Sequence, residues 1–333
     1  MAEAADKREA PLVVVVAGPT ASGKSALALD LAEAFEGTVI NADALQLYED
    51  LRVLSARPTP EEEARVPHKL YGVLPGGEAA SAGRWRKLAL AAIEETLAEG
   101  RLPILCGGTG LYIKALKEGL APVPTVSMEE RDAAEALFAM IGGEAMKERL
   151  AARDPETAEG IRPGDRQRLV RAWSVLETTG RGLAAWRREP GEGGAPYRFY
   201  DLLITPPREA LIEACERRFA AMLEAGALEE VRNLMEKGLP PEAPVLKAIG
   251  VPELSGHLSG VLPLKEAQAL AEAATRRYAK RQMTWLRTQA GLQETQSKEN
   301  EGCVIETQYS ESHRQKIFSK IRESLLTLRK AAD

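Results

Sequence analysis

The 333-residue chain lacks several features that would place it in common classes of protein. It has only three cysteines, Cys106, Cys215 and Cys303, which lie far apart in the sequence. That number and spacing suit neither a disulfide framework nor a zinc site, and they are typical of a reducing cytosol. No stretch approaches the roughly 18 apolar residues of a membrane span, and the N-terminal segment has no signal-peptide pattern. We therefore expect a cytoplasmic protein without a membrane contact.

The chain also lacks an excess of basic charge. Its formal net charge is -5 at pH 7, which excludes a global positive field, so any contact with nucleic acid must use local patches. The hydrophobic share of 44% is ordinary for a globular protein. The length suggests two domains, or one domain with a large insertion, and we expect a monomer.

A phosphate-binding loop is present near the N-terminus. Residues 12–17, LVVVVA, are apolar without alternation, which predicts a buried strand of a parallel sheet. The next residues, GPTASGKS, fit the pattern G-x-x-x-x-G-K-[ST] and lead into a helical segment. We expect phosphate groups to bind here, with Ser25 as a ligand of Mg²⁺. The predicted phosphate-binding residues are Gly18, Thr20, Ala21, Ser22, Gly23, Lys24 and Ser25.

Strands and helices alternate along the rest of the first 119 residues, and a further strand and further helices follow after residue 198. Further strands are predicted at 38–43, 102–106 and 199–205, and helices at 81–100, from about 111, at 207–226 and at 264–289. This alternation is typical of an α/β fold, here a P-loop-type doubly wound parallel sheet.

The pattern changes between residues 120 and 198, which carry helical periodicities and no convincing strand. We therefore predict an all-helical domain, 120–198, inserted between a first part of the core, 1–119, and a second part, 199–290. The remaining residues, 291–333, form a tail of unknown role that closes with a possible helix at 312–331.

Acidic residues near the phosphate loop distinguish possible chemistries. P-loop hydrolases normally hold Mg²⁺ with an aspartate that ends a neighbouring strand, but the third strand ends in Cys106-Gly107-Gly108. Asp43 follows the second strand at the carboxyl edge, where it could act as a general base or form an Asx turn or helix cap. Thr109, in the second glycine-rich turn, offers a hydroxyl to a ligand or caps a helix.

Two basic segments could contact nucleic acid. One contains Arg166, Arg168 and Arg171, and the other, residues 275–287, combines five Lys or Arg with Tyr278 and Trp285. Basic residues interleaved with aromatic ones suit single-stranded nucleic acid. A solvated helix face is the alternative interpretation for either segment alone.

A series of motifs carries a resemblance that covers residues 12–289. GPTASGKS, NADALQLY, VPHKL, GGTGLYIKAL, DRQRLVRA, RRFAAML, KAIGVPEL and RRYAKRQMTWLR occur in the order seen in the bacterial tRNA dimethylallyltransferase family, which the chain resembles. It departs from the family at Arg57, where a lysine is usual, and at Val251-Pro252, where many members have a tyrosine and a basic residue. These departures bear on local substrate contacts. The tail has no counterpart in this resemblance.

The resemblance implies transfer of a dimethylallyl group from dimethylallyl diphosphate to N6 of adenine 37 of tRNA, next to the anticodon. Asp43 matches the general base, Thr109 the residue that helps to hold the amine, and Arg218 the arginine that stabilises the leaving diphosphate together with Mg²⁺. The helical insertion would hold the anticodon stem-loop. The residues implied in tRNA binding are Asp43, Ala44, Leu45, Gln46, Thr109, Arg131, Gln167, Arg168, Leu169, Val170, Arg171, Lys247 and Gly250.

Three other functions share part of this pattern. A small-molecule or nucleotide kinase would have the same core, with the arginine-rich insertion as a phosphate lid. An isopentenyltransferase could act on free adenine nucleotide, and a non-catalytic RNA-binding protein could keep a relic of the loop. The motifs end by Arg287, so we expect removal of 296–333 to leave prenyl transfer nearly intact.

Overall fold

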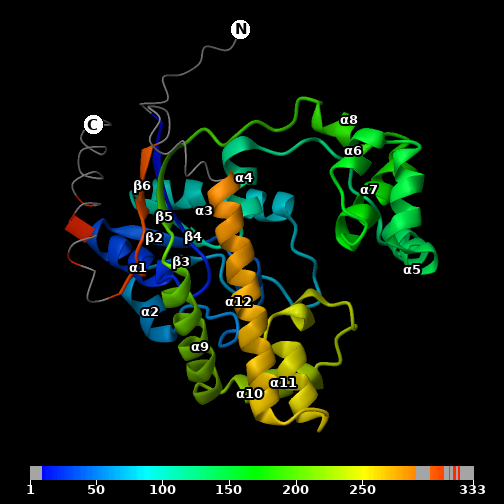
Figure 1. Cartoon of the computed structure of the whole chain (residues 1–333). Helices are drawn as coiled ribbons and strands as arrows, with labels where there is room; N and C mark the ends of the chain where they lie inside the picture. The colour runs from blue at the N-terminus through cyan, green and yellow to red at the C-terminus, as the bar shows by residue number, and fades with distance from the viewer. Residues whose placement is uncertain (1–9, 290–300, 311–314, 316–317, 320–321, 323–333) are drawn as a thin grey trace. The chain divides into compact units, whose positions relative to one another are not determined.

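The structure, a computed structural model, describes residues 10–289, 301–310, 315, 318, 319 and 322. The chain divides into two compact units, a core unit of Met1–Lys117 with Ala195–Asp333, and a helical unit of Glu118–Gly194 (Figure 1). The helical unit corresponds to the predicted insertion 120–198.

The core unit is built on a sheet in which every neighbouring pair of strands is parallel. Among the described residues the sheet has six strands, in the order β3-β2-β4-β1-β5-β6. This arrangement confirms the predicted α/β fold. The strands are β1 (Leu12–Ala17), β2 (Gly37–Asn41), β3 (His68–Lys69), β4 (Leu102–Gly107), β5 (Arg198–Ile204) and β6 (Glu301–Ile305).

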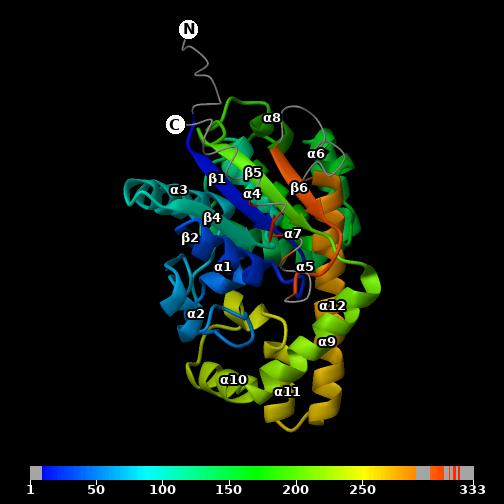
Figure 2. The ribbon, with the colours of Figure 1, turned by 90° about the vertical axis from the view of Figure 1, so that its left-hand side faces the viewer.

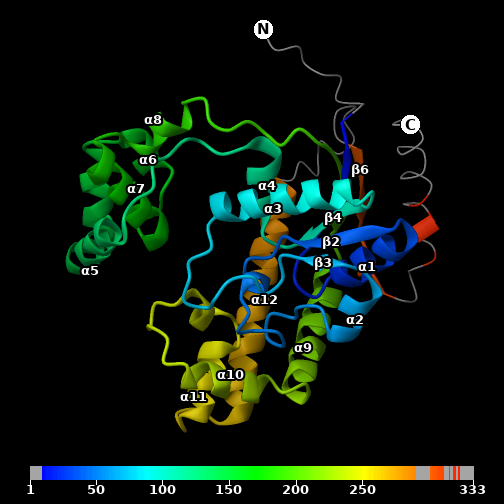
Figure 3. The same ribbon diagram turned by 180° about the vertical axis from the view of Figure 1, so that it is seen from behind.

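Both faces of the sheet are covered, which explains why β1 shows no alternation of apolar and polar residues. Val13 and Val15 belong to the cluster on one face, and Val14 and Val16 to the cluster on the other. Helix α1 covers the second face and α3 the first, and Figure 3 shows these two helices on opposite sides of the sheet.

Most predicted elements of the core unit are confirmed. Ser81 caps α3 by accepting a hydrogen bond from the Arg84 N–H at 3.1 Å. None of the described helices is long and apolar enough to cross a membrane. The helices of this unit are α1 (Lys24–Ala34), α2 (Pro60–Arg65), α3 (Ala82–Ala98), α4 (Gly110–Glu118), α9 (Arg208–Glu224), α10 (Ala227–Glu236), α11 (Val251–Leu258) and α12 (Leu264–Gln289), with 3₁₀ turns η1 (Leu45–Leu47) and η2 (Pro244–Lys247).

The helical unit has its own apolar core. Met146, Leu150, Leu169 and Val175 are fully buried in a cluster formed by residues of this unit alone. Its described residues form no strand longer than the isolated bridge Leu120–Glu192. Its helices are α5 (Met128–Ala151), α6 (Pro155–Glu159), α7 (Arg166–Thr179) and α8 (Leu183–Arg187).

The described part of the tail belongs to the core unit, which the sequence did not predict. Strand β6 pairs with β5 at the edge of the sheet (Figure 2), and Ile305 is buried against the face that carries α1. The Tyr309 N–H then donates a hydrogen bond to the Ser22 carbonyl of the phosphate loop at 3.0 Å. These contacts argue against the expectation that the tail is dispensable. Most of the predicted helix 312–331 lies outside the described residues.

Candidate functional site

The phosphate loop connects the carboxyl end of β1 to the first turn of α1. Two of its residues adopt left-handed backbone conformations, Ala21 with φ 61° and Gly23 with φ 88°. Lys24 is buried, and its Nζ donates a hydrogen bond to the Pro19 carbonyl at 3.3 Å. The chain therefore curls around the lysine, as a phosphate cradle requires.

Some hydrogen-bond donors of the loop are already engaged. The Thr20 N–H donates to Gln282 Oε1 at 2.8 Å, and the Ser22 N–H donates to the Pro19 carbonyl at 3.3 Å. The first N–H groups of a helix have no acceptor within the helix, so those at the start of α1 can donate to a bound ligand. The N–H groups of Thr20 and Ser22 are therefore not the donors that bind phosphate. If these two residues bind it as predicted, they do so through their other groups.

Arg218, on α9, lies at the phosphate loop although it is 198 residues from Thr20 in the sequence. Its Nη1 donates a hydrogen bond to Thr20 Oγ1 at 3.0 Å. Burial lowers the pKa of Lys24, the Asp43 carboxylate raises it, and Arg218 lowers it further. Burial also lowers the pKa of Arg218, again opposed by Asp43. A buried lysine and a half-buried arginine that repel each other form a site where an anion is stabilised.

Asp43 forms the Asx turn that was one of the two roles considered from the sequence. Its backbone N–H donates to Asn41 Oδ1 at 2.7 Å, and its own Oδ1 accepts from the Leu45 N–H at 3.1 Å, which forms an Asx turn before η1. Its other carboxylate oxygen makes no hydrogen bond to a described residue and remains available to accept a proton. Asp43 lines the same cavity as Lys24 and Arg218.

Thr109 joins Asp43 to the second glycine turn. Its Oγ1 accepts a hydrogen bond from the Ala44 N–H at 3.0 Å, and its backbone N–H donates to the Ala42 carbonyl at 3.2 Å. The Tyr278 side chain also hydrogen-bonds the Thr109 side chain. In this structure Thr109 holds the Asp43 loop in place.

One cavity of about 490 Å³ connects these groups. Its polar side is formed by Thr20, Lys24, Ser25, Asp43 and Arg218. Its other walls are largely apolar and include Leu45, Val53, Leu54, Phe219, Met222 and Ile249. The cavity can therefore hold a ligand that is anionic at one end and apolar at the other.

The residues near the cradle fit a magnesium ion that is held mainly by phosphate oxygens. Ser25 and Asp43 both line the cavity and supply oxygen atoms, the kind of ligand that Mg²⁺ prefers. Cys106 stands at the end of β4, and burial raises its pKa to about 11, so it remains a neutral thiol. Among the described residues no group of three or more His, Cys, Asp or Glu could hold a metal alone.

The predicted tRNA contacts of the core unit differ in accessibility. Ala44 and Leu45 are half-buried and Lys247 is exposed. Gln46 is buried, and its Nε2 donates to the Ser55 and Ala56 carbonyls, so its side chain supports a loop of the cavity wall. Gly250 is buried with φ 97° at the start of α11, and a Cβ there would lie 2.7 Å from Leu54.

The predicted tRNA contacts of the helical unit also divide into two groups. Leu169 and Val170 are buried in the core of the unit, so their side chains are not available to a ligand. Gln167, Arg168 and Arg171 on α7, and Arg131 on α5, are exposed.

The exposed arginines are not equally free to bind an anion. Arg168 lies 3.5 Å from Asp165 and Arg166 lies 2.6 Å from Glu135, whereas burial and the nearby Arg131 lower the pKa of Arg171. The charges of Arg131 and Arg171 lie near each other, so an anion that contacts both would be stabilised.

Helix α12 turns its aromatic residues toward the second glycine turn and exposes several of its basic residues, although the Arg281 guanidinium still lies over the Tyr278 ring, 5.5 Å from its centroid. Arg277, Lys280 and Arg281 are exposed. Tyr278 bonds the Thr109 side chain, and Trp285 lies where a Cβ on Gly110 would stand, 2.1 Å away. The cations can still meet RNA, but the aromatic side chains support the second glycine turn and do not form a surface for stacked bases.

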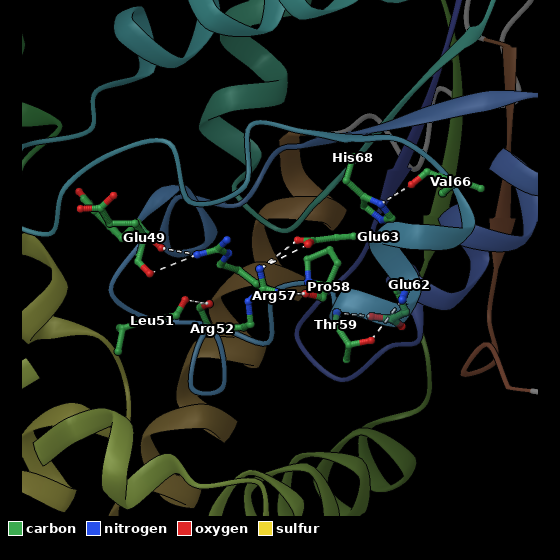
Figure 4. Close-up of polar contacts among 12 residues, drawn as sticks. Glu49, Leu51, Arg52, Arg57, Pro58, Thr59, Glu62, Glu63, Val66 and His68 are labelled. Carbon is green, nitrogen blue, oxygen red and sulfur yellow. Dashed lines mark hydrogen bonds and ion pairs between the residues drawn. The ribbon is translucent and has the colours of Figure 1, made fainter. Parts of the chain in front are cut away.

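The loop that carries Arg57 lines the cavity, and Figure 4 shows the polar contacts of this loop. Arg57 Nη1 donates to the Tyr48 and Glu49 carbonyls, both at 3.3 Å, and its guanidinium lies against Gly72, where a Cβ would be 2.3 Å away. Arg52 pairs with Glu63 at 3.2 Å. Arg57, where a lysine is usual in the family, thus ties its loop to residues 48, 49 and 72.

Three residues that support the site were missed by the sequence reasoning. Glu230, on α10, accepts backbone hydrogen bonds from Arg52, Val53 and Leu54. Gln282 and Tyr309 bond the phosphate loop from α12 and from the tail. Only Gln282 had a sequence indication, because it lies one helical turn after Tyr278 on the apolar face of α12.

Comparisons with known proteins agree with this geometry. A family model described as IPP transferase matches residues 46–289, and one described as isopentenyl transferase matches residues 11–71. The tRNA dimethylallyltransferase of Rhodospirillum centenum is 55% identical over 278 residues, which are 83% of this chain and 88% of that protein. That of Paramagnetospirillum magneticum is 48% identical over 314 residues, 94% of this chain and 97% of that protein. The second match is longer than residues 1–290, so it must include part of the tail.

Solved structures show the same fold. The tRNA isopentenylpyrophosphate transferase of Bacillus halodurans has a TM-score of 0.65 and 30% identity, and covers 96% of this chain and 98% of its own. A eukaryotic dimethylallyltransferase has a TM-score of 0.75 and 24% identity, and covers 94% of this chain and 80% of its own, which shows likeness of fold.

Proposed function

The chain belongs to the IPP transferase family and is a prenyl transferase, and we propose that it transfers a dimethylallyl group from dimethylallyl diphosphate to N6 of adenine 37 in tRNA. The observation that carries this proposal is the single cavity that is lined by two cations, Lys24 and Arg218, a carboxylate and apolar side chains. In the reaction, the bond from N6 to the allylic carbon forms as the bond from that carbon to oxygen breaks. The electron pair of the broken bond goes to diphosphate, and the amine proton goes to a base.

The phosphate loop and α9 form the leaving-group half of the site. The diphosphate would bind the N–H groups at the start of α1, with Lys24 and Arg218 as counter-charges. Burial lowers the pKa of Lys24, Asp43 raises it and Arg218 lowers it, so a bound anion would favour the charged form of the lysine. The interaction of both cations with the leaving group strengthens as negative charge develops in the transition state.

Asp43 and its loop form the nucleophile half of the site. The exocyclic amine of adenine is a weak nucleophile unless a base accepts its proton, and the unbonded carboxylate oxygen of Asp43 can do so. Thr109 holds the adjacent Ala44 N–H and so fixes the orientation of this carboxylate. The adenine must leave its stack to reach the cavity, which costs a few kcal/mol and less in a loop than in a duplex.

The apolar walls favour an allylic substrate over a nucleotide. Phe219, Met222 and Val53 offer no hydrogen bonds to a ribose, whereas they suit a five-carbon chain. A kinase would also need an acid near Cys106, and Asp201 on β5 is occupied by Lys117, 2.5 Å away. These features disfavour the kinase alternative.

Ser25 is the residue that would hold Mg²⁺ together with the diphosphate. When bound, the ion would neutralise charge on the leaving group.

The helical unit would bind the anticodon stem-loop through Arg131, Gln167, Arg168 and Arg171. Arginine contacts to RNA phosphates release counterions, so this binding would weaken as salt rises. We further propose that the protein is cytoplasmic, because the tRNA-modifying relatives are bacterial, and that it acts as a monomer.

A single incubation series tests the proposal. The protein is mixed with radiolabelled dimethylallyl diphosphate and, in separate reactions, tRNA, AMP or ATP. Label in tRNA alone supports the proposal, and label in AMP or ATP would indicate an enzyme of free nucleotides. A parallel reaction with γ-labelled ATP tests the kinase. No label transferred in any reaction would favour a non-catalytic RNA-binding protein.

A further inference from the structure

Helix α12 places the Gln282 side chain between the two glycine-rich turns of the active site. Gln282 is 5% exposed. Its Oε1 accepts a hydrogen bond from the Thr20 N–H at 2.8 Å, and its Nε2 donates one to the Gly108 carbonyl at 3.1 Å. The two partners fix the amide orientation, because only the oxygen can face an N–H and only the nitrogen can face a carbonyl.

The second glycine turn is shaped to receive this side chain. A Cβ on Gly108 would lie 2.1 Å from Gln282 Nε2, so any larger residue at 108 would displace the amide. Tyr278 and Trp285, on the same face of α12, bond Thr109 and cover Gly110. Three consecutive residues of the turn are therefore held by one helix face.

The Gln282 amide contacts the leaving-group half of the site with its oxygen and the nucleophile half with its nitrogen. On one side, Thr20 Oγ1 accepts the Arg218 hydrogen bond, so the position of Thr20 sets that of the arginine. On the other side, Gly108 precedes Thr109, whose Oγ1 holds the Ala44 N–H next to Asp43. Among the described residues, Gln282 is the side chain that hydrogen-bonds both turns directly.

We propose that Gln282 is a positioning residue that sets the spacing between the leaving-group half of the site, Thr20 with Arg218, and the nucleophile half, Thr109 with Asp43. The inference rests on the proposed prenyl transfer. It assigns to the Thr20 N–H a bond within the protein and leaves diphosphate to the N–H groups at the start of α1. Reaction across a gap between two half-sites depends steeply on this spacing, because misplacement by about 1 Å can cost about 100-fold in rate.

The test compares Gln282→Met with Gln268→Met in single-turnover prenyl transfer to tRNA. Methionine keeps the length of the side chain and removes both hydrogen bonds, and Gln268 lies on the same helix, where it bonds Glu272 only. We expect the Gln282 variant to react about 10-fold or more slowly, with nearly unchanged affinity for tRNA, and the Gln268 variant to match the wild type. All variants are assayed below their own melting temperatures. Transfer by Gln282→Met at the wild-type rate would overturn the inference, whereas failure of the wild type itself would overturn the proposed function.

Gln282→Glu adds a readout that a merely structural role would not change. Burial raises the pKa of a glutamic acid at this position. As pH falls, the acid becomes protonated, and its O–H can donate to the Gly108 carbonyl while the other oxygen accepts from the Thr20 N–H. We therefore expect the rate of the folded Glu variant, divided by that of the wild type, to rise as pH is lowered, and the Met ratio to stay flat. Parallel pH profiles for the two variants would contradict the proposal.

A double-mutant cycle with Thr20→Ala tests the route through Arg218. Thr20→Ala removes the hydroxyl that holds Arg218 and leaves the backbone N–H that bonds Gln282. If Gln282 acts through this contact, Gln282→Met will slow transfer by a smaller factor in the Thr20→Ala background than in the wild type. Equal factors in both backgrounds would show that Gln282 does not position Arg218.

Discussion

Replacing Tyr309 should destabilise the core unit far more than its place near the end of the sequence suggests. The Tyr309 side chain is 4% exposed, and its hydroxyl donates a hydrogen bond to Asp30 Oδ2 at 2.5 Å, where Asp30 is 7% exposed. A hydrogen bond to a charged group contributes about 1.5–3 kcal/mol, and loss of a large buried aromatic side chain costs about 3–5 kcal/mol. We therefore expect Tyr309→Phe to lower the free energy of unfolding by about 1.5–3 kcal/mol and Tyr309→Ala by about 3–5 kcal/mol.

Urea unfolding followed by circular dichroism measures these changes, with Tyr197→Phe as the matched control. No described residue hydrogen-bonds the Tyr197 hydroxyl, so that variant should unfold like the wild type. The Tyr309 main chain also covers Gly23, where a Cβ would lie 2.1 Å from the Tyr309 carbonyl oxygen. Removal of residues 301–333 should therefore also weaken binding of pyrophosphate. Unchanged urea midpoints for both Tyr309 variants would refute the docked position of the tail.

Three further predictions concern the reaction and the tRNA. Asp43→Asn keeps an acceptor for the Leu45 N–H, so kcat should fall at least about 100-fold with tRNA affinity unchanged, and near-normal turnover would exclude Asp43 as the base. Because the pKa of Lys24 is lowered and its useful form is the charged one, binding of diphosphate should weaken as pH rises, at a lower pH than for an ordinary lysine. Lys24→Arg should shift this loss of diphosphate binding to higher pH. Identical pH profiles for this variant and the wild type would contradict the prediction. Arg171→Ala should reduce the slope of log K against log salt for tRNA binding by up to about 1. Arg168→Ala should reduce it by less, because Arg168 pairs with Asp165, and Arg153→Ala should reduce it little, because Arg153 pairs with Glu177. Equal slopes for all variants and the wild type would show that this is only a solvated surface.

Local sequence patterns predicted the parts of the fold that depend on local interactions. The unbroken apolar run of β1, the glycine pattern after it and the Ser81 cap all act within a few residues. Strand β6 was missed because its sequence, EGCVI, is short and only partly apolar, and it forms by pairing with β5, about a hundred residues earlier in the chain.

The sequence predicted those residues of the site that belong to a recognisable local motif. Lys24 and Asp43 could be identified because each follows a predicted strand. The role of Arg218 came from the resemblance, because nothing near it in the sequence indicates a contact with Thr20. Residues 275–287 were interpreted as a surface of mixed basic and aromatic side chains. Helical spacing instead turns Tyr278, Gln282 and Trp285 toward the second glycine turn and leaves the cations exposed.

Mass spectrometry of tRNA after reaction tests the central claim most directly. Purified protein is incubated with dimethylallyl diphosphate, Mg²⁺ and unmodified tRNA, with ATP in a parallel reaction, and the nucleosides of the anticodon loop are then analysed. The account predicts one dimethylallyl group on N6 of the adenosine beside the anticodon, its loss in Asp43→Asn, and no ATP hydrolysis stimulated by tRNA. Phosphate transferred from ATP to an acceptor, with no prenylated adenosine, would contradict it.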